Sequence, residues 1–209
     1  MIRLKDRVIL ASKSAARRQM LEQVGLVFDS IPAQIDERAI EARFENSAPA
    51  ATANLSAPEA LSQELARQKA LFVAKDNPQA LVIGSDSVVA LGDEILHKAQ
   101  NMDEAFAKLQ RLSGQTHRLI SSVAVARGQV VLWSKIETAS LTMRQFDAAF
   151  LQRYLRRVGP KAALSCVGAY KLEAEGAWLF SEIKGDYHTI LGMPLIPLLN
   201  YLQDYHADE

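Results

Sequence analysis

The chain has 209 residues, of which 49% are apolar and 23% are charged, a composition typical of a globular protein. Its 24 basic and 24 acidic residues give no net formal charge, which disfavours a polynucleotide-binding or membrane-surface protein, because those usually present a basic patch. No apolar run approaches the roughly 20 residues that cross a bilayer, and the first residues lack the apolar core of a signal peptide. The single cysteine, Cys166, cannot form an internal disulfide. We therefore expect a cytoplasmic protein that does not associate with membranes.

The first predicted elements are a strand, a helix and a second strand. Residues 7–11, which are apolar after Arg7, predict a strand. Ser14 can cap a helix over residues 15–24, and Gly25 can end it. The run 27–31 combines apolar and polar residues and predicts a half-buried strand.

The middle of the chain predicts two helices around a buried strand. Residues 58–75 place apolar side chains near a 3.6-residue period, which indicates a helix. Residues 80–84 read as a buried strand that ends just before Asp86. Asn101 and Glu104 form a capping-box pattern at the start of a further helix.

The remaining segments complete an α/β pattern. Two β-rich runs flank Arg127-Gly128 and predict a hairpin. A helix near 147–157, a further pair of strands and a helix after Pro194 follow. Helices and strands interleave without a repeat or a separable linker, so we expect one α/β domain over residues 1–209.

The segment after the first strand has the composition of a phosphate-binding turn. Ser12 and Ser14 offer hydroxyl groups, the start of the helix offers free backbone N–H groups, and Arg17 and Arg18 offer guanidinium groups. The alternative is a capped surface helix with two exposed arginines. The segment alone does not decide between them.

Other charged residues can complete a metal and phosphate site. Carboxylates such as Glu37, beside Asp36, and Asp86 can coordinate Mg²⁺, which prefers oxygen ligands. Lys69 and Lys98 can neutralise charge on a pyrophosphate leaving group. Most charged residues simply face solvent. Asp86 stands out, because α/β proteins place functional groups at the carboxyl ends of strands.

Two further residues have a structural and a chemical interpretation. His117 follows a turn and can be a base, but a lone histidine there is more often structural. Cys166 has no obvious base partner and is expected to be a small buried side chain.

Taken in order, these segments resemble the Maf-like (septum formation inhibitor) family of nucleoside triphosphate pyrophosphatases. Each motif is weak alone, but the ordered set covers about residues 8–203. The matching motifs are Leu10 to Arg17, Asp36-Glu37, Leu65 to Ala70, Gly84 to Ser87, His97-Lys98-Ala99, Leu112 to His117, Gly168 to Tyr170, Gly185 to Tyr187 and Leu191 to Leu195.

The resemblance implies an elongated, two-lobed, mixed-sheet fold similar to inosine triphosphate pyrophosphatases, with the active-site cleft between the lobes. It implies hydrolysis of a nucleoside triphosphate to the monophosphate and pyrophosphate with Mg²⁺ or Mn²⁺, and it suggests a homodimer. Asp86 would be the general base and, with Glu37, a ligand of the metal. The implied triphosphate contacts are Ser12, Arg17, Lys69 and Lys98.

Three positions bear on the choice of nucleobase: Ala16, Ser87 and Glu173. The branch that prefers dTTP and UTP has Arg and Thr at the first two positions, and the branch that acts on 7-methyl-GTP has Trp and Gln. The segment from Cys166 to Glu173 matches the 7-methyl-GTP branch better, so we place the chain closer to that branch. The small side chain of Ala16 predicts a nucleobase pocket that is wider or that recognises the base through different contacts.

Other functions stay open from the sequence. A broad enzyme that removes modified or non-standard triphosphates would suit a wide pocket, and a dTTP/UTP pyrophosphatase is a further alternative. A non-catalytic regulator of cell division is the alternative from another class. The neutral charge and the retained Asp86, Glu37 and lysines disfavour that last reading.

Overall fold

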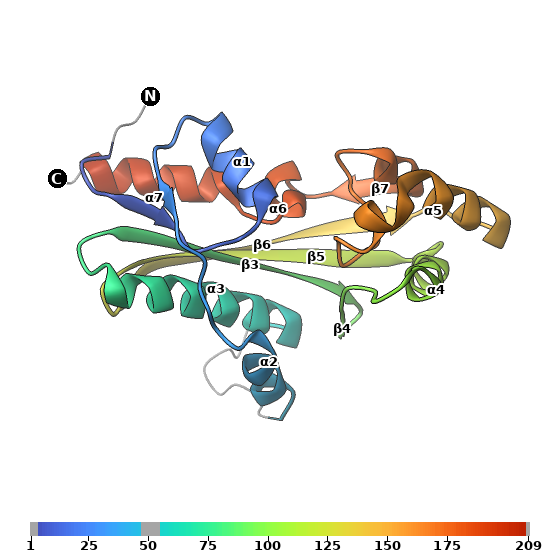
Figure 1. Ribbon diagram of the computed structural model, residues 1–209, viewed down its shortest axis with the longest axis horizontal. Coiled ribbons are helices and arrows are strands. Elements are labelled where there is room, and N and C mark those ends of the chain that lie inside the picture. Colours follow the sequence, from blue (N-terminus) through green and yellow to red (C-terminus); the bar gives the residue numbers. More distant parts are fainter. Residues whose placement is uncertain (1–3, 47–54, 208–209) are drawn as a thin grey trace. The chain divides into compact units, whose positions relative to one another are not determined.

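The computed structural model describes residues 4–46 and 55–207 (Figure 1). Its strands are β1 (Val8–Leu10), β2 (Asp29–Ser30), β3 (Leu81–Leu91), β4 (Glu94–Leu96), β5 (Thr116–Arg127), β6 (Val130–Met143) and β7 (Phe180–Lys184). Its helices are α1 (Ala15–Gln23), α2 (Glu37–Asn46), α3 (Ala57–Asp76), α4 (Met102–Leu112), α5 (Ala148–Ala163), α6 (Tyr187–Leu191) and α7 (Leu195–Ala207), with a 3₁₀ turn, η1, at Glu175–Leu179. Among the described residues, none of the helices combines the length and apolar character that a membrane span requires.

The strands form one mixed seven-stranded sheet. Its order is β2-β1-β3-β5-β6-β7, and β4 pairs with β3. Strand β1 runs parallel to β2 and β3, whereas the β3–β4 and β6–β7 pairs are antiparallel. The predicted α/β class is therefore confirmed.

The chain divides into two compact units. The first comprises Met1–Val88, Ile120–Glu137 and Asp186–Glu209, and the second comprises Val89–Leu119 and Thr138–Gly185. Strands β3, β5 and β6 each contribute residues to both units. The cleft between two lobes and the single-domain organisation stay predictions.

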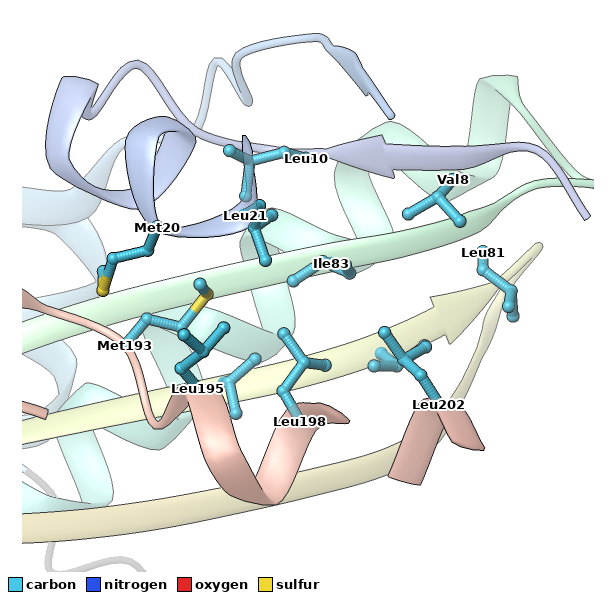
Figure 2. Close-up of a cluster of buried hydrophobic side chains, with 12 residues drawn as sticks. Val8, Leu10, Met20, Leu21, Leu81, Ile83, Met193, Leu195, Leu198 and Leu202 are labelled. Carbon is cyan, nitrogen blue, oxygen red and sulfur yellow. The ribbon is translucent and has the colours of Figure 1, made fainter. Parts of the chain in front are cut away.

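In the first unit, strand alternation supplies two separate apolar cores. Leu81 and Ile83 of β3 face one side, where α1 and α7 pack, whereas Val82 faces α3 on the other side (Figure 1). Full burial of such a side chain contributes about 1.5–3 kcal/mol. Figure 2 shows the first core, whose buried members are Val8, Leu10, Met20, Leu21, Leu81, Ile83, Val123, Val125, Met193, Leu195, Leu198 and Leu202.

A close contact between β3 and α3 sets the position of the site. A Cβ added to Gly84 would lie 2.2 Å from the Ala66 carbonyl oxygen and 2.5 Å from the Ala70 nitrogen. Only glycine on the strand and small residues on the helix allow this approach. Because Asp86 lies two residues beyond Gly84, it points to the same face, toward α3.

The strand predicted over 80–84 is longer than expected. Strand β3 continues to Leu91, so the prediction that Asp86 follows the end of its strand is wrong. The polar run from Ser85 to Ser87 interrupts the apolar pattern, but Val88 and Val89 continue the buried strand beyond it. The strand that does end nearby is β1, whose last residue, Leu10, pairs with Ile83.

Helix α2 was not predicted. Most of its residues are polar, and Ile40 is its buried apolar side chain among the residues whose burial is described, so no apolar stripe marked it as a helix. Its start carried a signal nonetheless, since the Asp36 side chain accepts a hydrogen bond from the Ala39 N–H at 3.0 Å.

Other boundaries differ from the sequence predictions by a few residues. Strand β2 covers only Asp29–Ser30, β4 was missed, and a single strand, β7, stands where a pair was expected. Helix α5 ends at Ala163 and is kinked at Gly159, whose φ is 73°. The hairpin turn at Gly128 and the helices after Ser14, Asn101 and Pro194 are confirmed.

Candidate active site

A buried lysine joins two of the predicted site residues. The Lys69 Nζ lies 2.6 Å from Asp86 Oδ1 and 2.7 Å from Glu37 Oε1. The Lys69 and Asp86 side chains are each 10% exposed, whereas Glu37 is 56% exposed. Helices α2 and α3 and strand β3 thus bring three charged groups to one point.

The environment of Asp86 opposes its ionisation. Burial raises the pKa of the Asp86 carboxyl above its ordinary value, and the nearby Glu37 carboxylate adds to this effect. Lys69 and Arg17 lower that pKa without cancelling the effect of burial. A carboxyl group held in this way is a suitable proton acceptor once it is ionised.

The turn after β1 agrees in part with each interpretation of Arg17 and Arg18, the phosphate-binding turn and the capped surface helix. Ser14 caps α1 by accepting a hydrogen bond from the Arg17 N–H. The Arg17 side chain turns inward, while Arg18 is exposed. The Arg17 guanidinium lies 3.4 Å from the Ser12 hydroxyl, so the predicted residues Ser12 and Arg17 are brought together.

Arg17 is held by further contacts. Its Nε donates to the Gly192 carbonyl oxygen at 2.8 Å, and its Nη2 donates to the Ser87 hydroxyl at 2.9 Å. Burial lowers the pKa of the Arg17 guanidinium, and the Asp86 and Glu37 carboxylates oppose this change. The guanidinium is therefore an oriented cation in the same neighbourhood as Asp86.

The predicted specificity residues fall in both units. Ala16 precedes Arg17 on α1 and is half-buried, and Ser87 lies on β3 in contact with Arg17. Glu173 and the predicted phosphate ligand Lys98 are exposed residues of the second unit. Their roles stay predictions.

His117 has the structural role that the sequence favoured. It is fully buried, and its Nε2 lies 2.6 Å from the Tyr170 hydroxyl, beside the ring of Phe180. Burial lowers the pKa of His117 from 6.5 to about 4. Cys166 is half-buried rather than buried.

The lowered pKa of His117 predicts pH-dependent stability. Above pH 6.5 the His117 side chain is mostly neutral in both the folded and the unfolded protein. Between pH 6.5 and about 4, His117 binds a proton in the unfolded chain but stays neutral in the folded chain. The free energy of unfolding should therefore fall by about 1–2 kcal/mol from pH 7 to pH 5 through this residue. In urea unfolding, the free energy of unfolding of His117→Gln should fall between pH 7 and pH 5 by about 1–2 kcal/mol less than that of wild type. An unchanged pH dependence would contradict the assignment, and His97→Gln, at an exposed histidine, is the control.

Three site residues were missed by sequence reasoning. Ser85 and Ser121 are fully buried, and the Gly192 carbonyl accepts hydrogen bonds from Arg17 and from Ser85. Their signal was present, because serines inside apolar strands must find partners. The acceptor for Ser85 is Gly192, in the motif from Leu191 to Leu195, where Gly192 has a φ of +115°, and the acceptor for Ser121 is the Thr189 carbonyl.

The amino-acid sequence matches that of known proteins. The family model described as "Maf-like protein" matches residues 7–205. This chain belongs to the Maf family. A protein of Rhizobium johnstonii, named 7-methyl-GTP pyrophosphatase, is 48% identical over 98% of both chains. A protein of Brucella suis with the same name is 47% identical over 94% of this chain and 95% of the relative. A protein of Granulibacter bethesdensis, named nucleoside triphosphate pyrophosphatase, is 42% identical over 96% of this chain and 98% of the relative.

Proposed function

We propose that this Maf protein hydrolyses a nucleoside triphosphate to the monophosphate and pyrophosphate, with 7-methyl-GTP as a substrate. The observation that carries the proposal is the convergence of Asp86, Lys69 and Glu37 beside Arg17, in a chain that matches full-length relatives named for this activity. A cation held between two carboxylates, with a second cation in the same neighbourhood, is what a polyphosphate and its attacking water require.

Each residue has a distinct part in the proposed reaction. Asp86 accepts a proton from water, whose oxygen bonds to phosphorus as the bridging P–O bond between the α and β phosphates breaks. Lys69 lies within hydrogen-bond distance of Asp86 and can turn to the charge that grows on the departing pyrophosphate. Arg17 donates to the triphosphate, beside the hydroxyl of Ser12.

The donor set fits a divalent metal. The Asp86 and Glu37 oxygens lie within two hydrogen-bond lengths of each other, on either side of Lys69 Nζ, and both are ligands that Mg²⁺ and Mn²⁺ prefer. No group of three such acidic, His or Cys side chains occurs among the described residues, so substrate phosphates and water would complete the shell. A bound metal would neutralise phosphate charge and orient the triphosphate.

The role of Glu37 can be tested by removing its charge. Glu37→Gln should raise the Mg²⁺ concentration for half-maximal activity about tenfold or more, because one anionic ligand is lost. A Mg²⁺ titration of pyrophosphate release measures this, with Glu22→Gln, at an exposed glutamate of α1, as the matched control. An unchanged titration would remove Glu37 from the metal site.

The nucleobase is addressed by a panel of substrates. We expect pyrophosphate release from 7-methyl-GTP to exceed that from GTP, dTTP and UTP, in line with the name that the Rhizobium johnstonii and Brucella suis relatives share. Comparable rates across the panel would favour an enzyme that acts on many triphosphates, which is consistent with the small Ala16 side chain. Preference for dTTP and UTP would overturn the choice of branch. The homodimer and the cytoplasmic location stay predictions from the sequence.

A further inference from the structure

Three serines line the face of the sheet opposite Asp86. Ser85 and Ser87 alternate with Asp86 along β3, so their side chains point away from α3. Ser121 of β5 lies beside them, since its hydroxyl oxygen is 2.9 Å from that of Ser87. Ser85 and Ser121 are fully buried. Polar groups buried in this way require hydrogen-bond partners. These partners are the backbone carbonyl groups of Thr189, in α6, and of Gly192, between α6 and α7.

The hydroxyl groups form a chain with a fixed direction. Arg17 Nη2 donates to Ser87 Oγ at 2.9 Å, and Ser121 Oγ donates to the Thr189 carbonyl oxygen at 2.8 Å. Since Ser87 accepts from Arg17, its own hydrogen is free to reach either Ser121 Oγ or the Gly192 oxygen, which lies 3.0 Å away.

The number of hydrogen bonds that the Gly192 carbonyl oxygen can accept decides which of the two acceptors the Ser87 hydrogen reaches. Its oxygen already accepts from Arg17 Nε at 2.8 Å and from Ser85 Oγ at 3.0 Å, which fills its two lone pairs. The Ser87 hydrogen therefore goes to Ser121. Every group in the chain from Arg17 to Thr189 then has a partner, and such complete networks are rigid.

Glycine is needed at the centre of this network. Gly192 has a φ of +115°, and a Cβ there would lie 3.2 Å from Ser87 Oγ and 3.6 Å from Arg17 Nε. A side chain at this position would strain the turn and crowd the Ser87 hydroxyl that accepts from the guanidinium. The motif from Leu191 to Leu195 thus presents a backbone oxygen to Arg17.

The network leaves part of the guanidinium available. Arginine has five N–H groups; one on Nε and one on Nη2 are used by Gly192 and Ser87, and one on Nη1 points to Ser12. The remaining N–H groups on Nη1 and Nη2 can bind two phosphate oxygens at once. Orienting them before the substrate arrives reduces the entropy lost on binding.

We propose that Ser87, Ser121 and the Gly192 carbonyl are positioning groups that hold Arg17 ready for the triphosphate. Ser87 then acts on phosphate binding rather than on the choice of nucleobase. Ser121, which touches neither phosphate nor base, acts only through Ser87. The inference rests on the proposed function, because it needs Arg17 to contact the substrate.

The test is binding of inorganic tripolyphosphate, measured by calorimetry, together with KM for 7-methyl-GTP and GTP. Ser121→Ala and Ser87→Ala should each weaken tripolyphosphate binding about three- to tenfold, as loss of one hydrogen bond would, and raise both KM values by the same factor. Ser87→Thr, which keeps the hydroxyl, should restore binding. In an Arg17→Ala background, Ser121→Ala should not weaken tripolyphosphate binding further, because Ser121 acts on the ligand only through Arg17.

Ser122→Ala is the matched control. Ser122 is equally buried on β5, but its hydroxyl lies on the other face and contacts Ser62. This variant should lose stability without loss of tripolyphosphate affinity. Unchanged affinity in Ser121→Ala, a changed 7-methyl-GTP to GTP ratio in Ser87→Ala, or additive effects in the Arg17→Ala background would each overturn the inference. A wild-type protein that binds tripolyphosphate but releases no pyrophosphate would overturn the proposed function alone.

Discussion

Asp86→Asn should lower kcat for pyrophosphate release by about a thousandfold, within the range that general-base catalysis contributes. The amide has the shape of the carboxyl group but cannot accept the proton of water. It is also a poorer metal ligand than a carboxylate, so both proposed roles of Asp86 are lost together. Steady-state release of pyrophosphate from 7-methyl-GTP measures the change.

The fold should survive the Asp86→Asn substitution. Burial already opposes the charge of Asp86, so a neutral side chain relieves a desolvation penalty, while Lys69 keeps its contact with Glu37. The thermal midpoint should stay within about 5 °C of wild type. Asp76→Asn, at the exposed end of α3, should keep full activity. Near-normal turnover in Asp86→Asn would remove Asp86 from the role of base.

Lys69→Met should have opposite effects on catalysis and on metal binding. Turnover should fall about a hundredfold or more, because the leaving pyrophosphate loses a cation. Mn²⁺ binding in the absence of nucleotide should tighten about tenfold, since the Lys69 ammonium lies within 2.7 Å of both carboxylates and competes with any cation there.

The two effects need separate measurements. Mn²⁺ affinity is followed by the paramagnetic resonance of free Mn²⁺, and turnover by pyrophosphate release. Lys75→Met, at an exposed lysine near the end of α3, should change neither. Weaker Mn²⁺ binding in Lys69→Met would show that Lys69 assembles the metal site rather than competes for it.

The sequence predicted the parts of the site that depend on local chemistry. Ser14 as a helix cap, the turn around Ser12 and the helix that carries Lys69 follow from hydroxyl capping and apolar periodicity. Helix α2 was missed because few of its side chains pack in the core, although it carries Glu37. Tertiary contacts rather than local propensity hold such a helix in place.

Residues that act through long-range contacts were beyond local reasoning. Ser121 and Gly192 are far apart in the sequence, and only the folded chain shows that both are linked to Arg17. Asp86 was chosen because it was expected at a strand end, yet it lies inside β3 and is distinguished by its contact with Lys69. Asp86 was thus selected by a partly wrong structural argument, and its catalytic role stays a prediction.

The central claim concerns which bond is cleaved, and phosphorus NMR of the products tests it most directly. The protein is incubated with 7-methyl-GTP and Mg²⁺, and the phosphorus signals are followed with time. We expect 7-methyl-GMP and pyrophosphate in equal amounts from the first turnover. Formation of 7-methyl-GDP and inorganic phosphate, or no reaction with any nucleoside triphosphate of the panel, would contradict it.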